Sequence, residues 1–538
     1  MKIFKKEKLN IKYKDLNDYL INNPVLEYKE NDYHLLPDLN KAVNYLCDKK
    51  ESKIVIYGDY DSDGINASMI MYKGLKSLGY KNINISIPER SEGYGTNINR
   101  INKIIEENNE IVITVDNGIS SIEDIEVLNK HNITTIITDH HEPKEVLPNA
   151  YCVIDPKRKD SEYPFKDICG AVVAYKLIKG LNEYFNSEID KKLLCYCAIA
   201  TLSDTMPILD ENKYYVSKGL EIINSNSILI RSILTAMNMN NKINELNEED
   251  LLFYVAPFIN SSSRVASVKD CLCMYFFDDN FNTCLKYATT INKHNNLRKN
   301  LSKELYDEVN VKIKKDYPFI NNTKEPIIIA GDNYHQGIIG IVAGRINNEF
   351  NVPCVILTKE DNKYHGSCRS IEEINLLDLF DTSLDLFEKF GGHKQAAGLS
   401  LPIDNLYEFK HRVHEYSLKN YPQSIFEKTI DVTCKLNLNE ATIDTIDSIN
   451  DRRPFGHLNE EPLFYGEYKI NNIIKLGKDD KHLKLIVEDN SANNKEILLF
   501  NYNKNYDFKD KINLTFRLNI NEFRGNKTIQ LIAEDLVE

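Results

Sequence analysis

The sequence predicts an α/β protein in which a parallel-sheet domain is joined by a helical connector to a smaller α/β domain and a C-terminal β-barrel. Three observations predict this fold class. Short apolar runs alternate with helical patterns from residue 53 to 156, a shorter α/β pattern starts at residue 326, and alternating strands follow from about residue 425. At 538 residues, the chain exceeds what one hydrophobic core usually supports, so several domains are expected.

The first α/β pattern is typical of βαβ units. Its apolar runs are KIVIYGD, NINISIP, EIVITVD, TTIITD and AYCVID, and helical patterns separate most of them. Strands of a buried parallel sheet show such continuous apolar runs because both faces of the sheet are covered. A helical stretch from Gly170 to about Met206 is expected to close this domain.

The segment from 209 to 322 is predicted to be helical. Its mixed-charge run KHNNLRKNLSKELYDEVNVKIKK has two interpretations. It is either a solvated linker helix, or it places Lys293, Arg298 and Lys299 along a groove that follows a phosphate backbone.

The second α/β unit runs from the strand PIIIAGD to GGHKQAAGLSL. Between them we expect the helix HQGIIGIVAGRI, the strand PCVILT, a turn at HGSCRS and the helix LDLFDTSLDLFEKF. The later strands, such as HLKLIVEDN and INLTFRLNI, alternate as in a small OB-like barrel. Tyr465, Tyr468, Phe516 and Arg517 of that barrel could form a stacking surface for bases or belong to its core.

Composition narrows the function classes only in part. The net charge of −13 excludes a generally basic surface for polyanions but allows a local basic groove. The eleven cysteines lack zinc-knuckle or redox spacing, which favours reduced thiols. Neither a signal peptide nor a membrane span is predicted, so we expect a cytoplasmic protein without a membrane partner.

Acidic and histidine residues follow three of the predicted strands. They are Asp59, Asp61, Asp63, Asp116, Asp139, His140 and His141. In an open parallel sheet, ligands bind at the carboxyl ends of the strands, which is where these residues lie. The sequence therefore predicts a site at this edge of the first sheet.

A single aspartate after a strand is usually a helix cap, but capping does not explain the alternating aspartates of DYDSDG. Clustered carboxylates repel one another and need a cation to be stable. Carboxylates with imidazoles suit Mn²⁺ or Mg²⁺ better than structural zinc, which favours thiolates. Two such cations, roughly 3.5 to 4 Å apart, form the usual clamp for phosphoryl chemistry.

Four motifs in order, DYDSDG, VDNG, DHH and ATLSDTMP, resemble those of the DHH phosphoesterase superfamily. The later Gly391-Gly392-His393 resembles the hallmark of the DHH-associated substrate domain. From about residue 50 onward, the chain is similar to the single-strand-specific 5′-to-3′ exonuclease family of this superfamily. The resemblance implies a DHH domain, a DHH-associated domain and an OB fold that binds single-stranded DNA.

The resemblance also implies metal ligands and two further catalytic residues, Asp59 and His141. The implied ligands of two Mn²⁺ or Mg²⁺ ions are Asp61, Asp63, Asp116, His140 and Asp204. Asp116 would bridge the ions, and a water activated by them would attack the phosphorus. From the residues alone, Asp204 could equally be a helix cap.

Candidate substrate-binding residues lie mostly in the second half of the chain. Ser367 and Arg369 resemble a phosphate-gripping turn of the family and are candidates for the 5′-phosphate anchor. Arg90 and Arg264 are further candidates for phosphate contacts, although single arginines are often surface residues. His393 could reach the substrate or only fit a corner, and the resemblance of Gly391-Gly392-His393 to the family hallmark favours substrate contact.

The expected function is a metal-dependent exonuclease that degrades single-stranded DNA from its 5′ end in repair and recombination. The alternatives are a DHH phosphodiesterase for short oligonucleotides or cyclic dinucleotides, and a non-catalytic scaffold. A single-strand-binding protein and a helicase are candidate partners of the expected monomer. We predict domains at 1–50 (N-terminal extension), 51–208 (DHH), 209–322 (connector), 323–412 (DHH-associated) and 413–538 (OB-like).

Overall fold

The computed structural model describes residues 3–4, 8–93, 95–477, 480–502, 508–523 and 525–538. The chain divides into two compact units, one formed by Lys29–Glu427 and the other by Met1–Tyr28 together with Lys428–Glu538. In the part of the chain that the structure describes, no helix has the length and apolar character needed to cross a membrane.

The first sheet is parallel throughout and has five strands, as the apolar runs predict. Across the sheet they are β4 (Ile83–Ser86), β3 (Ile54–Tyr57), β5 (Ile111–Val115), β6 (Thr134–Thr138) and β7 (Cys152–Ile154). Neighbouring strands β3, β5 and β6 all end at the same edge because their registers match along their length. The polar residues that follow these strands therefore meet there.

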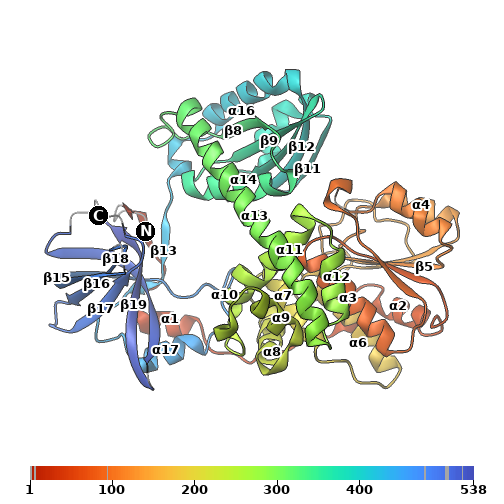
Figure 1. Ribbon diagram of the computed structural model, residues 1–538, viewed down its shortest axis with the longest axis horizontal. Coiled ribbons are helices and arrows are strands. Elements are labelled where there is room, and N and C mark those ends of the chain that lie inside the picture. Colours follow the sequence, from red (N-terminus) through yellow and green to blue (C-terminus); the bar gives the residue numbers. More distant parts are fainter. Residues whose placement is uncertain (1–2, 5–7, 94, 478–479, 503–507, 524) are drawn as a thin grey trace. The chain divides into compact units, whose positions relative to one another are not determined.

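Helices cover both faces of this sheet. They are α2 (Leu39–Leu46), α3 (Ser62–Ser77), α4 (Ile98–Glu106), α5 (Ile122–Lys130) and α6 (Gly170–Tyr184), and α7 (Leu193–Ser203) packs in turn on α3 and α6. Ile54 and Ile56 of β3 belong to the core with α2, α3 and α6, whereas Val55 and Tyr57 pack with α4 and α5. Figure 1 shows α4 on the opposite side of the sheet from α2 and α6. Burial on both faces explains why the strands are apolar throughout.

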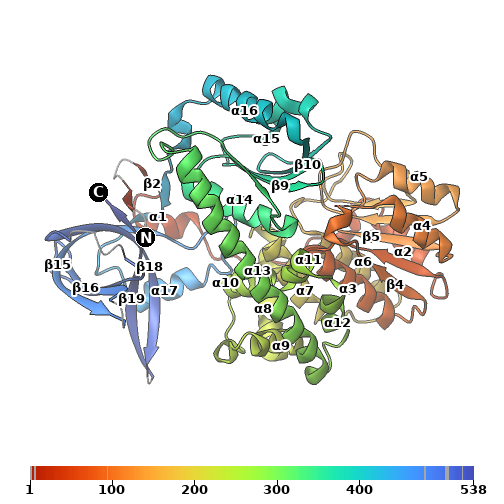
Figure 2. The ribbon, with the colours of Figure 1, turned by 45° about the horizontal axis from the view of Figure 1, so that its top comes forward.

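The connector is helical, as predicted. It contains α8 (Asp210–Asn226), α9 (Ile228–Ala236), α10 (Glu248–Asp250), a π-helical segment (Leu251–Val255), α11 (Ala256–Val265), α12 (Lys269–Phe276) and α13 (Phe281–Asp316). The mixed-charge run lies in α13, a helix of 36 residues that packs against α11 and α14. It is the long green helix of Figures 1 and 2.

The second sheet has the strand order β11 (Lys389–Gly392), β12 (Ala396–Pro402), β10 (Lys363–Arg369), β9 (Cys354–Glu360) and β8 (Ile327–Asp332). Only β8 and β9 are parallel. The helices of this region are α14 (Gln336–Phe350), α15 (Leu376–Phe380) and α16 (Leu406–Asn420). The sheet and α14 share one apolar core.

Two predicted elements of this region are wrong. HGSCRS is not a turn: His365 to Arg369 lie within β10, where each residue pairs with both β9 and β12. The helix predicted over LDLFDTSLDLFEKF ends at Phe380, continues as a 3-10 segment (Asp381–Leu386) and gives way to β11. The helix stops because Asp, Thr and Ser are poor helix formers. The last residues of the segment form β11 because they pair with β12.

The other unit is built around a closed β-barrel. Its strands are β15 (Phe464–Leu476), β16 (His482–Glu488), β17 (Asn494–Leu499), β18 (Lys511–Phe523) and β19 (Asn526–Val537). The barrel closes because β15 pairs with β16 and β18, while β19 pairs with β18 and, in parallel, with β17. This arrangement confirms the OB-like fold.

The N-terminal residues join this barrel unit, which the sequence did not indicate. The strand β1 (Ile3–Phe4) pairs with β19, and β2 (Leu9–Ile11) pairs with β13 (Ile430–Val432). The other elements of the unit are α1 (Leu16–Asn22), β14 (Cys434–Lys435) and α17 (Ile443–Asn450).

Candidate metal centre and phosphate-binding site

The loop between β3 and α3 brings its aspartates inward. Asp61 caps α3, and its carboxylate accepts a hydrogen bond from the Gly64 N–H at 3.0 Å. Asp59 and Asp63 are buried although neither caps the helix. A Cβ on Gly64 would lie 2.5 Å from the Asp59 carbonyl oxygen, so the loop depends on glycine there. Capping therefore accounts for one of the three aspartates.

The N-terminus of α6 holds the carboxylate of Asp63. The N–H groups of Gly170 and Ala171 each donate to one carboxylate oxygen at 2.8 Å. The first N–H groups of a helix lack partners within the helix and favour an anion. A Cβ on Gly170 would lie 2.6 Å from the side chain of Asp116, so glycine also lets α6 approach the second motif.

His140 lies at the centre of the acidic residues. Its Nε2 is 3.1 Å from Asp116 Oδ1, 3.6 Å from Asp204 Oδ2 and 3.7 Å from Asp63 Oδ2. Asp116 has a φ of 59°, in the left-handed region, which lets the chain turn directly after β5. Residues about 140 positions apart in the sequence thus share one site.

The structure brings all seven predicted ligand and catalytic residues together. Three sets have ligand atoms within 4.8 Å of one another: Asp116 with His140 and His141, Asp63 with His140 and Asp204, and Asp59 with Asp61 and Asp116. Oδ1 of Asp59 and Oδ1 of Asp116 are buried and accept no hydrogen bond. Oxygen donors left without partners, next to an imidazole, fit a hard divalent cation.

The pKa values describe the same crowding. Burial and the charge of Asp61 raise the pKa of Asp63 to about 6 and that of Asp59 well above its usual range. Burial and neighbouring carboxylates also raise the pKa of Asp116 and Asp204. Burial and the charge of His141 lower the pKa of His140 to about 3, which keeps its ring neutral and able to ligate.

Asp139 orients His141, a role that the sequence did not assign. One Asp139 oxygen accepts hydrogen bonds from the N–H groups of His140 and His141 and lies 2.8 Å from His141 Nδ1. Burial lowers the pKa of His141, but the hydrogen bond to Asp139 and the charges of Asp139, Asp204 and Asp63 together outweigh burial and raise the pKa to about 9. His141 is therefore an imidazolium at neutral pH. The position of Asp139 in the same Asp-His-His motif was the sequence signal that could have indicated this role.

Asp155 directly follows β7, and it was not among the site residues that the sequence predicted. It is fully buried, its Oδ1 accepts from the Lys157 N–H at 2.7 Å, and its Oδ2 has no partner. Burial and the charge of Asp139 raise its pKa to about 8.

We expect a pH-dependent effect of Asp155→Asn on stability. The folded pKa lies above the unfolded value of about 3.9, so the folded state retains a proton that the unfolded state loses. The contribution of Asp155 to stability therefore falls as pH rises from about 4 to about 8. Asparagine stays neutral, so the Tm difference between variant and parent should shift in favour of the variant over this range. Thermal unfolding in a metal chelator measures it, and a difference independent of pH would contradict the assignment.

Four arginines from separate elements lie close together near the carboxylate–imidazole centre. Arg90, Arg264, Arg298 and Arg369 are called the arginine group below. Burial and the positive charges of Arg90, Arg298 and Arg369 lower the pKa of Arg264 to about 9. Arg264 Nη1 donates to the Gly337 carbonyl oxygen at 3.2 Å, and Arg369 Nη1 donates to Ser367 Oγ at 3.2 Å. Among the described residues, none of these guanidinium groups is ion-paired with a carboxylate. Unpaired, partly buried cations that repel one another are suited to binding an anion.

The helix α14 connects the members of this arginine group. A Cβ on Gly337 would lie 2.1 Å from the Arg264 carbonyl oxygen, and one on Gly340 would lie 2.8 Å from Ser367 Oγ. The two glycines thus allow α11 and β10 to approach the same helix. Tyr60, within DYDSDG, places its ring 4.4 Å from the Arg90 guanidinium and so links the arginine group to the metal centre.

The other predicted residues make contacts of a different kind. His393 is exposed in the hairpin after β11, and no described contact joins it to Ser367 or Arg369. Tyr468 and Phe516 are buried in the barrel core, and Tyr465 is buried in a separate small core cluster beside it. Arg517 pairs with Glu461 and Glu534. These aromatics are therefore core residues and not a stacking surface.

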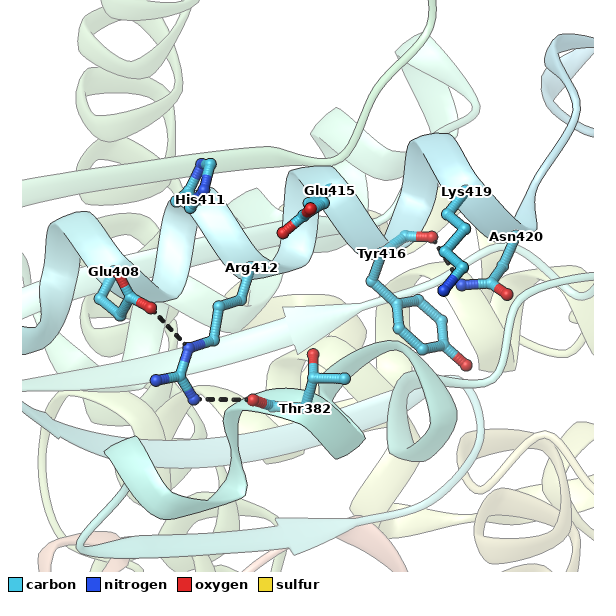
Figure 3. A pocket seen from close by; sticks show the side chains of 8 residues that line it. All are labelled: Thr382, Glu408, His411, Arg412, Glu415, Tyr416, Lys419 and Asn420. Carbon is cyan, nitrogen blue, oxygen red and sulfur yellow. Dashed lines mark hydrogen bonds and ion pairs between the residues drawn. The ribbon is translucent and has the colours of Figure 1, made fainter.

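A surface pocket of about 570 Å³ lies along α16 and does not contain the predicted site. Its lining consists of Thr382, Glu408, His411, Arg412, Glu415, Tyr416, Lys419 and Asn420 (Figure 3). Arg412 bridges Glu408 and the Thr382 carbonyl oxygen there, at 2.7 and 2.8 Å. The local ion pairs stabilise the helix and indicate no ligand.

Three family models match the chain in succession. They are the DHH family, N-terminal domain (residues 53–201), the DHHA1 domain (324–418) and the RecJ OB domain (432–535). The single-stranded-DNA-specific exonuclease RecJ of Bacillus subtilis is 29% identical over an alignment of 497 residues that covers 90% of this chain. The chain spans 61% of the length of that relative.

Solved structures have the same fold. RecJ of Thermus thermophilus, in complex with Mn²⁺, gives a TM-score of 0.79 at 23% identity and covers 96% of this chain and 72% of its own. A structure of exonuclease RecJ bound to manganese gives a TM-score of 0.61 at 25% identity, covering 75% of this chain and 98% of its own.

The fold, the order of the motifs and the carboxylate–imidazole site define a protein of the DHH phosphoesterase superfamily. The OB domain that follows narrows the class further. Over most of its length the chain is similar to RecJ, and its β-barrel matches the RecJ OB domain.

Proposed function

We propose that the chain is a metal-dependent 5′-to-3′ exonuclease that hydrolyses single-stranded DNA in repair and recombination. The observation that carries the proposal is that one compact unit holds both a carboxylate–imidazole centre and an unpaired arginine group. The Bacillus relative is named for activity on single-stranded DNA. The proposed domain boundaries are those of the sequence analysis.

The donor set fits two Mn²⁺ or Mg²⁺ ions, which would activate water and neutralise charge on the scissile phosphate. Asp61, Asp63, Asp116, His140 and Asp204 would hold them. Asp116 is the proposed bridge because its carboxylate belongs to two of the three ligand sets. A RecJ structure that matches this fold is bound to manganese, which supports the choice of metal.

Two further residues act on the substrate in this proposal. His141, kept protonated by Asp139, donates a hydrogen bond to a phosphate oxygen or a proton to the leaving 3′ oxygen. Asp59 lies within the ligand set of Asp61 and Asp116 and keeps those carboxylates in place.

The arginine group supplies the 5′-end specificity. Ser367 and Arg369 would bind the terminal phosphate, with Arg264 and Arg90 completing the contacts through their guanidinium donors. His393 would reach a more distant part of the strand. A single-strand-binding protein and a helicase are proposed partners of a monomer. Eleven unpaired cysteines agree with the reducing cytoplasm, where we place the protein.

The test is hydrolysis by the purified full chain with Mn²⁺. We expect a 5′-phosphorylated single strand to be degraded from its 5′ end, whereas blunt duplex DNA of the same sequence is degraded far more slowly. A cyclic dinucleotide and a linear dinucleotide serve as competing substrates. Hydrolysis of the dinucleotides alone would overturn the exonuclease proposal in favour of a small-substrate phosphodiesterase. Hydrolysis of nothing with any divalent cation would favour a scaffold.

A further inference from the structure

Arg298 is fixed in position on α13 by a buried neighbour. Its Nε and Nη2 both donate to Asn295 Oδ1, at 3.2 and 2.9 Å. Asn295 is 1% exposed, and Arg298 is partly buried, whereas Lys293 and Lys299 are exposed. A guanidinium held by two hydrogen bonds to a neutral amide keeps its full charge and its remaining donors. Of the three cations that the mixed-charge run offers, Arg298 is the one with a defined orientation.

The position of Arg298 follows from the packing of α13 on α11. His294 Nδ1 lies 3.4 Å from Ser262 Oγ, so the turn that precedes Arg298 lies beside the turn that precedes Arg264. The charge of Arg298 contributes to the lowered pKa of Arg264. Arg298 therefore borders the arginine group from the side of the connector helix.

Ser367 and Arg369 approach Arg264 through a different element. They contact α14 at Gly340, one turn beyond Gly337, which contacts the Arg264 backbone. Arg264 thus has β10 residues on the α14 side and Arg298 on the α13 side. A terminal phosphate carries a charge of about −2, which two arginines neutralise. Ser367 with Arg369, Arg264 and Arg90 already supplies that charge, so Arg298 has charge and donors for a second anionic group.

We infer that Arg298, positioned by Asn295, binds an internal phosphodiester of the strand whose terminal phosphate is held by Ser367 and Arg369. The inference rests on the proposed function and deepens it. In this arrangement α13 of the connector contacts the DNA strand, so binding of the strand does not depend on the terminal phosphate alone.

The test is equilibrium binding of 3′-fluorescein-labelled oligothymidylate in a metal chelator, which prevents hydrolysis. One strand carries a 5′-phosphate, the other a 5′-hydroxyl, and each is titrated over a KCl series. We expect Arg298→Ala to weaken binding of both strands about tenfold. The slope of log K against log [KCl] should become shallower by about 0.7, the value for one phosphate contact on a single strand.

Further variants separate charge from position. Arg298→Lys should keep the salt slope, because the charge remains, but lose part of the affinity, because lysine lacks the two-donor fork to Asn295. Asn295→Ala should weaken binding with an unchanged slope. Lys303→Ala, an exposed lysine on the same helix, should change neither. Circular dichroism melting confirms that each variant is folded.

The failures of the two proposals are distinguishable. If the parent protein binds neither strand, the proposed function fails. If it binds both and Arg298→Ala leaves affinity and slope unchanged, the inference alone is overturned. A loss confined to the 5′-phosphorylated strand would also overturn it, because Arg298 would then serve the terminal phosphate.

Discussion

Asp116→Asn is expected to lower Mn²⁺-dependent hydrolysis of single-stranded DNA by about 10³-fold. Cations at such sites supply several kcal/mol of charge stabilisation in the transition state, and each 1.36 kcal/mol is about a factor of ten in rate. Asp116 belongs to two of the three ligand sets, so its loss affects more of the centre than the loss of a ligand from one set. Initial rates on a 5′-phosphorylated strand measure the effect.

The same variant should not be less stable without metal. Burial and neighbouring carboxylates raise the pKa of Asp116, so removing its charge relieves desolvation and repulsion in the chelated protein. Its Tm should equal or exceed that of the parent, while the rise in Tm on adding Mn²⁺ should shrink because binding to the folded state is lost. Asp279→Asn, at an exposed aspartate, is the matched control. Full activity or an undiminished Mn²⁺-induced rise in Tm would remove Asp116 from the metal centre.

Arg264→Ala is expected to weaken binding of a 5′-phosphorylated strand by about 10- to 100-fold. Hydrogen bonds to charged groups contribute about 1.5 to 3 kcal/mol, and each 1.4 kcal/mol is about a factor of ten in affinity. Arg264 lies among Arg90, Arg298 and Arg369 without a carboxylate partner in the described part of the chain, so its charge is free for the ligand. We expect KM to rise more than kcat falls, because the contact is made in the ground state as well.

Stability distinguishes a binding role from a structural one. Burial and three positive neighbours lower the pKa of Arg264, so removing its charge should relieve desolvation and repulsion and leave the Tm of the unliganded protein unchanged or higher. Arg264→Lys should recover part of the affinity through its charge. Arg231→Ala, at an exposed arginine of α9, should behave as the parent. A large fall in Tm with unchanged KM would show that Arg264 only supports the fold.

Most of the fold could be predicted because local pattern and tertiary environment agree. The apolar runs of β3, β5 and β6 are buried on both faces, and the alternating strands of the tail form the barrel. The exceptions are segments whose partners lie elsewhere in the chain. HGSCRS became strand β10 because β9 and β12 flank it, and β1 and β2 pair with strands more than 400 residues away.

The candidate site was predictable as a set of residues but not as an arrangement. The motifs and their order identified the carboxylates and histidines. The sequence also indicated that these residues meet, because parallel strands end at one edge of the sheet. The support for Asp63 from the N-terminus of α6 and the contact of Gly170 with Asp116 depend on the packing of a distant helix. The orientation of Arg298 by Asn295 has the same origin, because only the burial of α13 fixes Asn295.

By itself, the sequence determined the class of fold, the motifs and the residue types of a metal centre, because these follow from local periodicity and the chemistry of side chains. The tertiary structure decided which groups meet: the neutral His140 among carboxylates, the Asp139–His141 pair, and arginines from α11, α13 and β10 gathered without counter-ions among the described residues. The physical reason is that burial and the charges of neighbouring groups determine the protonation states and the ion pairing of these side chains. Both depend on contacts between residues far apart in the chain.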